Sequence, residues 1–160
     1  MRTLLSFACL SAAILVGTPP ARAGNEPDDH HPVVASATLQ PSTSHAGDTV
    51  TLIVNVKIAP GWHIYAKGSS GPEIVTTLNL ATLPKGVTAK GEWKWPKPDA
   101  GEEGTKIYQG EVTFRHTFQL AADAPAGSLA IACDMGYQAC NASACKPPAK
   151  LKLKATGAVK

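Results

Sequence analysis

The chain has 160 residues, a formal net charge of +3 and 44% hydrophobic residues, enough apolar material for the core of a single domain. The 14 glycines and 13 prolines indicate many turns, but they lack the period of collagen and the abundance typical of a disordered tract. The charge is weak, and no cluster of Lys and Arg alternates with aromatic residues. A nucleic-acid-binding surface is therefore not expected.

The first 23 residues have the features of a secretory signal peptide. Arg2 gives a positive start, residues 4–16 are mostly apolar, and Ala21-Arg22-Ala23 is an A-x-A cleavage site. The apolar run is shorter than the roughly 20 residues that span a bilayer, which disfavours the alternative of a membrane anchor. The mature chain is therefore expected in an oxidising compartment, where disulfides persist.

After a polar leader at 24–31, which we expect to be flexible, apolar residues recur with a period of two. Turn signals such as Ala59-Pro60-Gly61 and Pro84-Lys85-Gly86 separate the alternating segments. Seven or eight short strands, with no helical period, predict an all-β fold built as an antiparallel sandwich. The clearest apolar faces are those of Val50, Leu52, Val54, Val56 and Ile58, of Val112, Phe114, His116, Phe118 and Leu120, of Leu129, Ile131, Cys133, Met135 and Tyr137, and of Leu151 and Leu153.

Three cysteines lie beyond the predicted signal peptide. Cys133 is on an apolar face and is expected to be a buried, inert thiol. Cys140 and Cys145 flank the short stretch Asn-Ala-Ser-Ala, and two strand ends joined by such a loop can approach within disulfide range. A disulfide that closes so short a loop contributes only about 2 kcal/mol. The residues alone thus leave two alternatives, redox chemistry and a structural staple.

A metal site is the remaining alternative for the cysteine pair. Cys140 and Cys145, joined by His63 or His116, have the donor types that bind Zn²⁺ or Cu⁺, but the spacing is not C-x₂-C and no second pair exists. His116 is expected to be a core histidine, and a His pair in the leader is expected to be solvated. No hydrolase, paired-carboxylate or phosphate-loop motif is present, so neither a metal nor a cofactor is expected.

Four segments resemble, in order, a known family. They are Pro60–Lys67 (PGWHIYAK), Trp93–Pro96 (WKWP), Tyr108–Val112 (YQGEV), and Tyr137–Cys140 followed after four residues by Cys145–Pro148 (YQAC-x₄-CKPP). Together they resemble the N-terminal periplasmic domain of the thiol:disulfide interchange protein DsbD, over roughly residues 33–155. The paired-cysteine motif is the most specific of the four.

The resemblance implies an immunoglobulin-like β-sandwich over residues 32–156 that carries one reversible disulfide and acts as a thiol:disulfide oxidoreductase. By motif position, Cys145 would form the mixed disulfide with partner proteins and Cys140 would resolve it. His63 and Tyr65 match an aromatic pair beside the disulfide.

The resemblance also implies a cap and a set of partners. Trp93 and Trp95 match a cap segment that covers the disulfide in the family. The implied partners are thioredoxin-like periplasmic proteins, including disulfide isomerases and reductases of cytochrome c maturation, and a membrane thiol-electron transporter. Because the sequence ends at Lys160, we expect a free-standing version of the domain. The signal peptide predicts a periplasmic location, no later segment is apolar enough to cross a membrane, and we expect a monomer. A secreted binding module or metal carrier with a static disulfide is the alternative function.

Overall fold

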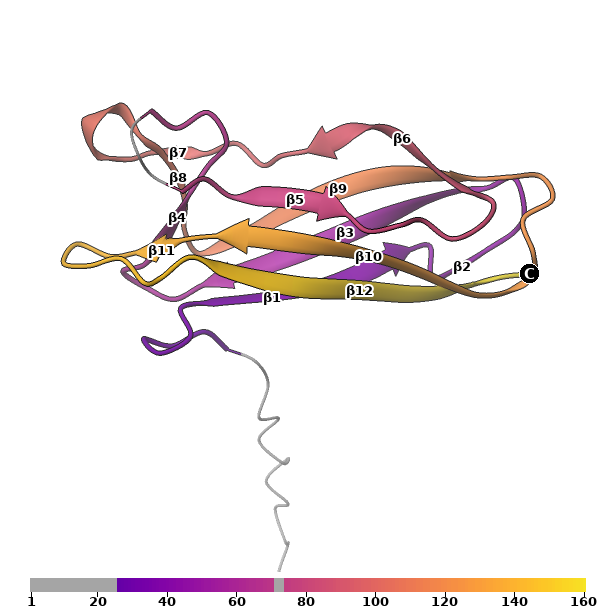
Figure 1. The fold of residues 1–160 in the computed structure, drawn as a ribbon, viewed down its shortest axis with the longest axis horizontal. Coiled ribbons are helices and arrows are strands. Elements are labelled where there is room, and N and C mark those ends of the chain that lie inside the picture. Colours follow the sequence, from indigo (N-terminus) through magenta and orange to yellow (C-terminus); the bar gives the residue numbers. More distant parts are fainter. Residues whose placement is uncertain (1–25, 71–73) are drawn as a thin grey trace, which may run out of the picture.

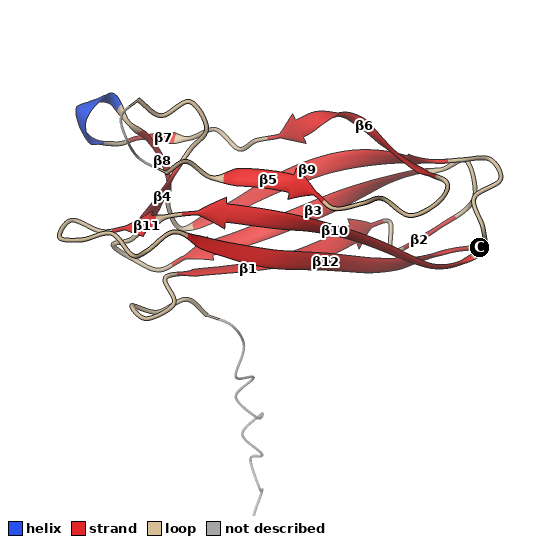
Figure 2. Cartoon of the chain, in the orientation of Figure 1, coloured by secondary structure: helices blue, strands red, loops and turns tan. Residues whose placement is uncertain are grey.

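The computed structural model describes residues 26–70 and 74–160, so the predicted signal peptide and the first two leader residues lie outside the described residues. Strands dominate this part of the chain, and its one short helix is the 3-10 helix η1 (Glu102–Gly104) (Figure 2). Across the described ranges, no helix has the length and apolar character needed to cross a membrane.

Two four-stranded sheets form the layers of a sandwich (Figure 1). In spatial order, the first sheet contains β1 (Val33–Gln40), β3 (Thr49–Ile58), β9 (Glu111–Leu120) and β6 (Val87–Lys94). The second sheet contains β2 (Thr43–Ser44), β12 (Ala149–Val159), β10 (Gly127–Tyr137) and β5 (Thr77–Leu80). Neighbouring strands are antiparallel except β2 and β12, which are parallel.

The alternation in the sequence forms the core between these sheets. In β3 and β9, opposed residues such as Val54 and Phe114 point to the same inner face, and both are fully buried. The inner face of β10 supplies Ile131 and Met135 from the second sheet, and both are also fully buried. The predicted sandwich and its four clearest strands are therefore confirmed.

A third, smaller sheet lies at the end of the sandwich opposite the C terminus (Figure 1). This small sheet has short strands in the order β11 (Ala139–Cys140), β4 (His63–Tyr65), β8 (Lys106–Tyr108) and β7 (Asp99–Ala100). Its strands have two or three residues, too few to reveal a period of two in the sequence. For this reason the structure contains more strands than the seven or eight predicted.

The burial predicted for two single residues is confirmed, and one strand boundary differs. Cys133 is 1% exposed, and burial raises the pKa of its thiol to about 11. His116 is a buried core histidine whose Nδ1 lies 3.0 Å from the carbonyl oxygen of Thr117. The sequence predicts that Cys140 ends the strand of Tyr137, but β10 ends at Tyr137 and the chain then crosses to the small sheet, where Cys140 pairs with β4.

Candidate functional site

The small sheet places three of the predicted site residues in one row. Cys140 is opposite His63 in the antiparallel pair of β11 and β4, and on its other side it forms a bridge with Cys145. Opposed residues on neighbouring strands point to the same face, about 5 Å apart. Ala139 and Ile64, one position along each strand, point to the other face and join the hydrophobic core. The sulfur-bearing face is therefore the outer face of the small sheet.

Cys140 and Cys145 form a disulfide with a Cα–Cα distance of 4.0 Å. The two cysteines differ sharply in accessibility, because Cys140 is completely buried whereas Cys145 is exposed. A thiol of an incoming protein can reach only an exposed sulfur. The geometry thus distinguishes an outer cysteine, Cys145, from an inner one, Cys140.

Hydrogen bonds shape the disulfide hairpin, which we define as residues 139–146. The side-chain oxygen of Asn141 accepts hydrogen bonds from the backbone N–H groups of Ser143 and Ala144, both at 2.9 Å. The Asn141 N–H donates to the carbonyl of Ala144 at 2.9 Å, and the Lys146 N–H donates to the carbonyl of Ala139 at 2.8 Å. These bonds give the loop a defined path, so both cysteines are presented from ordered backbone.

A tight turn before β4 positions His63, which lies at the other end of the row from Cys145. The Trp62 N–H donates to the carbonyl of Ala59 at 3.0 Å, and Gly61 has a φ of +79°. Proline followed by a glycine of positive φ is the pattern of a type II turn, and a side chain at Gly61 would be strained there. The turn buries Trp62, which is 7% exposed, and delivers His63 to the outer face.

His63 and Tyr65 lie on the same face of β4, with ring centroids 5.1 Å apart in an edge-to-face arrangement. Partial burial lowers the pKa of the His63 imidazole below its usual value, and the nearby Glu102 carboxylate opposes that shift. The ring is therefore mainly neutral at neutral pH and does not provide a positive charge to the sulfur pair.

The two tryptophans of the predicted cap are packed against β9. The Trp93 ring meets His116 edge-on at 5.1 Å, and the Trp95 ring meets Phe114 edge-on at 5.3 Å. Both side chains are half-buried, and Lys67 Nζ lies 5.9 Å from the centroid of the Trp95 ring. The structure therefore assigns both rings contacts with the core strand, and a cap role for either stays a prediction.

Sequence reasoning did not single out three residues that belong to the surroundings of the disulfide. Glu102 in η1 acts electrostatically on His63, Asn141 holds the hairpin loop, and Asp29 contacts Trp62. Only Asn141 has a local signal, because Asn at the start of a loop commonly accepts hydrogen bonds from the backbone N–H groups that follow it. The other two depend on contacts between distant segments.

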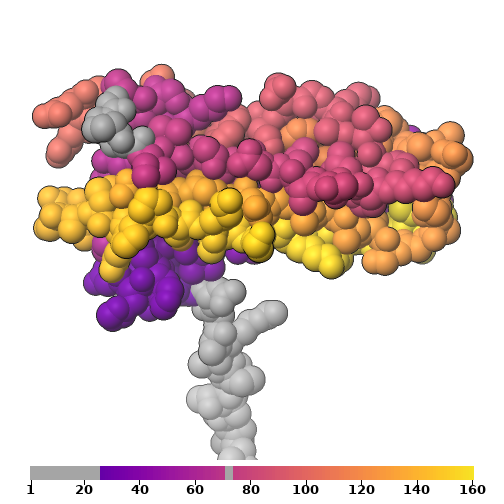
Figure 3. Space-filling view, viewed as in Figure 1, coloured from indigo at the N-terminus to yellow at the C-terminus, as the bar shows by residue number. Residues whose placement is uncertain are grey.

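In residues 26–70 and 74–160, no three side chains of His, Cys, Asp and Glu are grouped so as to hold a metal ion. Figure 3 shows the orange hairpin at one end of the molecule, with the salmon segment of η1 on one side and the indigo N-terminal residues on the other. The site is thus a disulfide with one exposed cysteine, Cys145, set between two flanking segments.

Fold and site together define a class, a two-sheet β-sandwich with an accessible disulfide at one end. The family described as "Thiol:disulfide interchange protein DsbD, N-terminal" matches residues 30–156. The chain therefore belongs to this family of thiol–disulfide interchange domains, and the resemblance seen in the sequence is confirmed. The immunoglobulin-like class predicted for the sandwich is confirmed with it.

The chain is similar to two solved structures. The N-terminal periplasmic domain of ScsB from Proteus mirabilis has a TM-score of 0.50 and 21% identity, over 76% of this chain and 44% of that one. The N-terminal domain of DsbD from Neisseria meningitidis, in the reduced form, has a TM-score of 0.39 and 18% identity, over 80% and 90% of the two chains. The chain thus spans less than half of the ScsB domain. No curated protein matches the sequence.

Proposed function

We propose that this protein is a periplasmic electron relay, a thiol:disulfide oxidoreductase that passes reducing equivalents through the Cys140–Cys145 disulfide to partner proteins. The observation that carries the proposal is the unequal exposure of the two cysteines on an ordered hairpin. A structural staple gains nothing from an exposed cysteine, whereas exchange with another protein requires one. The family supports the same chemistry.

The exchange proceeds in two steps. In the reduced protein, the Cys145 thiolate attacks a partner disulfide, forms a mixed disulfide and releases one partner sulfur as a thiolate. The Cys140 thiolate then attacks the Cys145 sulfur, the bond to the partner breaks, and the second partner sulfur leaves and takes up a proton. Two electrons have moved to the partner, and the Cys140–Cys145 bond has formed again.

A thioredoxin-like donor, supplied with electrons by a membrane thiol transporter, would reduce the pair for the next cycle. Thioredoxin-like periplasmic proteins are the proposed acceptors, including those of disulfide isomerisation and cytochrome c maturation. His63 and Tyr65 are proposed to border the docking surface, because they share the outer face with the disulfide. The A-x-A signal in the sequence supports a periplasmic location.

The decisive experiment is the reduction potential of the Cys140–Cys145 pair, measured by equilibration with glutathione and thioredoxin buffers. A relay disulfide is expected to equilibrate with these buffers. A potential well below roughly −300 mV would instead identify a static structural disulfide and refute the proposal.

Trapping experiments test the roles of the two sulfurs. Cys140→Ala is expected to accumulate a mixed disulfide through Cys145, whereas Cys145→Ala is expected to lose partner-reducing activity. The matched control is Cys133→Ala, because this thiol is buried in the core and takes no part in exchange. Full activity in Cys145→Ala would refute the assignment.

A further inference from the structure

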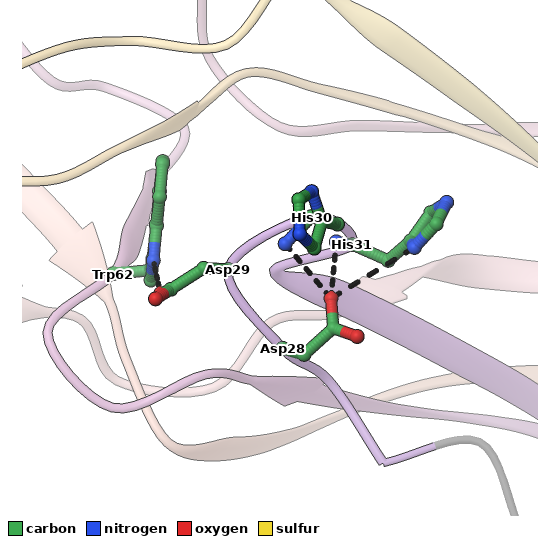
Figure 4. Close-up of polar contacts among 5 residues, drawn as sticks. All are labelled: Asp28, Asp29, His30, His31 and Trp62. Atoms are coloured by element: carbon green, nitrogen blue, oxygen red, sulfur yellow. Dashed lines mark hydrogen bonds and ion pairs between the residues drawn. The ribbon is translucent and has the colours of Figure 1, made fainter.

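The N-terminal segment, which we define as residues 26–32, is tied to the turn before β4. The indole N–H of Trp62 donates a hydrogen bond to the Asp29 carboxylate at 2.9 Å, and Figure 4 shows the two side chains meeting. A buried indole N–H needs an acceptor, and a carboxylate makes this bond a charge-assisted one. Asp28 shapes the same segment by accepting the backbone N–H groups of His30 and His31 at 2.8 and 2.6 Å.

The same indole also contacts the arm of the disulfide hairpin that carries Cys145. Lys146, the next residue, places its Nζ 5.3 Å from the centroid of the Trp62 ring, which is a cation–π contact. Trp62 therefore interacts with an anion at its N–H edge and with a cation over its face. The negative carboxylate at the indole N–H increases the electron density on the face of the ring. This strengthens the attraction between the ring and the cation.

Direct packing between the segment and this arm is incomplete. A cavity of about 280 Å³ is lined by His31 and Pro32 of the segment and by Lys146 and Pro147 of the arm. Apolar contact across this gap is correspondingly reduced, so the contacts centred on Trp62 connect the two segments. They reach the arm one residue after Cys145.

We propose that Asp29, Trp62 and Lys146 are positioning residues that keep the Cys145 arm close to Cys140 when the disulfide is open. This inference rests on the proposed function and concerns its second step. In that step the Cys140 thiolate attacks the Cys145 sulfur, so its rate depends on how closely the backbone holds the two sulfurs. The first step, attack by Cys145 on an incoming disulfide, needs no such proximity.

The two steps can be separated with oxidised glutathione as the probe. The reduced chain is mixed with the probe, quenched in acid, and the glutathione adduct is quantified on the peptide that carries Cys145. Asp29→Ala removes the hydrogen bond to Trp62, and Lys146→Met removes the cation–π contact with Trp62. Either loss is expected to lengthen the lifetime of the adduct about fivefold. In a Cys140→Ser background, which reports only the first step, Asp29→Ala is expected to leave the rate of adduct formation unchanged. For Lys146→Met, which also removes the cation next to Cys145, the adduct lifetime is compared with the rate of formation measured in the same background.

Matched variants separate positioning from general stability. Lys146→Arg keeps the cation and is expected to restore the short lifetime. Asp29→Asn keeps an acceptor oxygen but loses the charge, so its lifetime is expected to lie between those of the wild type and Asp29→Ala. Glu26→Gln is the control, because Glu26 lies in the same segment but binds Lys57, at 2.7 Å, rather than Trp62. It is expected to behave like the wild type.

Two results would overturn this inference while leaving the proposed function intact. One is an adduct lifetime in Asp29→Ala and Lys146→Met equal to that of the wild type. The other is an equal slowing of both steps, which would indicate a general loss of structure. A wild-type chain whose Cys140–Cys145 pair does not exchange with glutathione at all would instead refute the proposed function, and the inference with it.

Discussion

Reduction of the Cys140–Cys145 disulfide is expected to lower the free energy of unfolding by only about 2 kcal/mol, a value that follows from the entropy of closing so short a loop. The two cysteines are separated by 5 positions in the sequence. Cys140 is fully buried but is not a member of the hydrophobic core cluster, and Cys145 is exposed, so we expect the core to keep its packing when the bond opens. Domains are typically stable by about 5–15 kcal/mol, so the protein should stay folded in both redox states, as a relay must.

Urea unfolding of the oxidised and reduced forms, followed by circular dichroism, measures this difference. The double variant Cys140→Ala, Cys145→Ala serves as a control that lacks the bond without any reductant, and it should match the reduced form. A reduced protein that has lost its strand signal, or a difference above about 4 kcal/mol, would refute the reasoning, because the disulfide would then be a major determinant of the fold.

Three further predictions concern groups whose pKa values are shifted. Burial raises the pKa of the Cys133 thiol from 9.0 to about 11, so its stabilising contribution is complete below pH 9 and is lost as the pH rises to about 11. The free energy of unfolding of the wild type should fall over this pH range by at most about 3 kcal/mol, and that of Cys133→Ala should not show this fall. The same dependence of the free energy on pH in both proteins would contradict the prediction. Glu102→Gln should lower the pKa of His63 further, as measured by NMR titration of the imidazole, because the carboxylate opposes the effect of burial. Glu103→Gln is the control, and an upward shift in Glu102→Gln would count against the proposed contact. Hydrogen bonds from backbone N–H groups lower the pKa of Asp28, so its contribution to the N-terminal segment is present above the usual carboxyl pKa and is lost as the pH falls through the lowered value. Amide NMR signals of the segment should shift in that acidic range in the wild type and already be shifted at neutral pH in Asp28→Ala; a segment insensitive to both changes would show that the Asp28 bonds are dispensable.

The long strands could be predicted because the alternation of apolar and polar residues within each strand shows which of its side chains are buried. In β3 and β9, apolar and polar residues alternate over ten positions, and this pattern is a local property of the chain. The pairing of Cys140 with Cys145 was also within reach, because the two cysteines are joined by a short loop and lie in a specific motif. The same local signals placed Cys133 and His116 in the core.

Tertiary structure alone decided how these parts meet. The small sheet joins strands of two or three residues from three separated parts of the sequence, and strands so short have no period to detect. Whether Cys140 or Cys145 is exposed depends on what covers each sulfur, and those neighbours come from the whole chain. The contact of Asp29 with Trp62 bridges 33 positions, and its partners are chosen by the packing of the sandwich rather than by neighbouring residues. Local alternation therefore determined the strands, and the short loop and its motif determined the cysteine pair. Long-range packing determined which cysteine is exposed and which segments hold it.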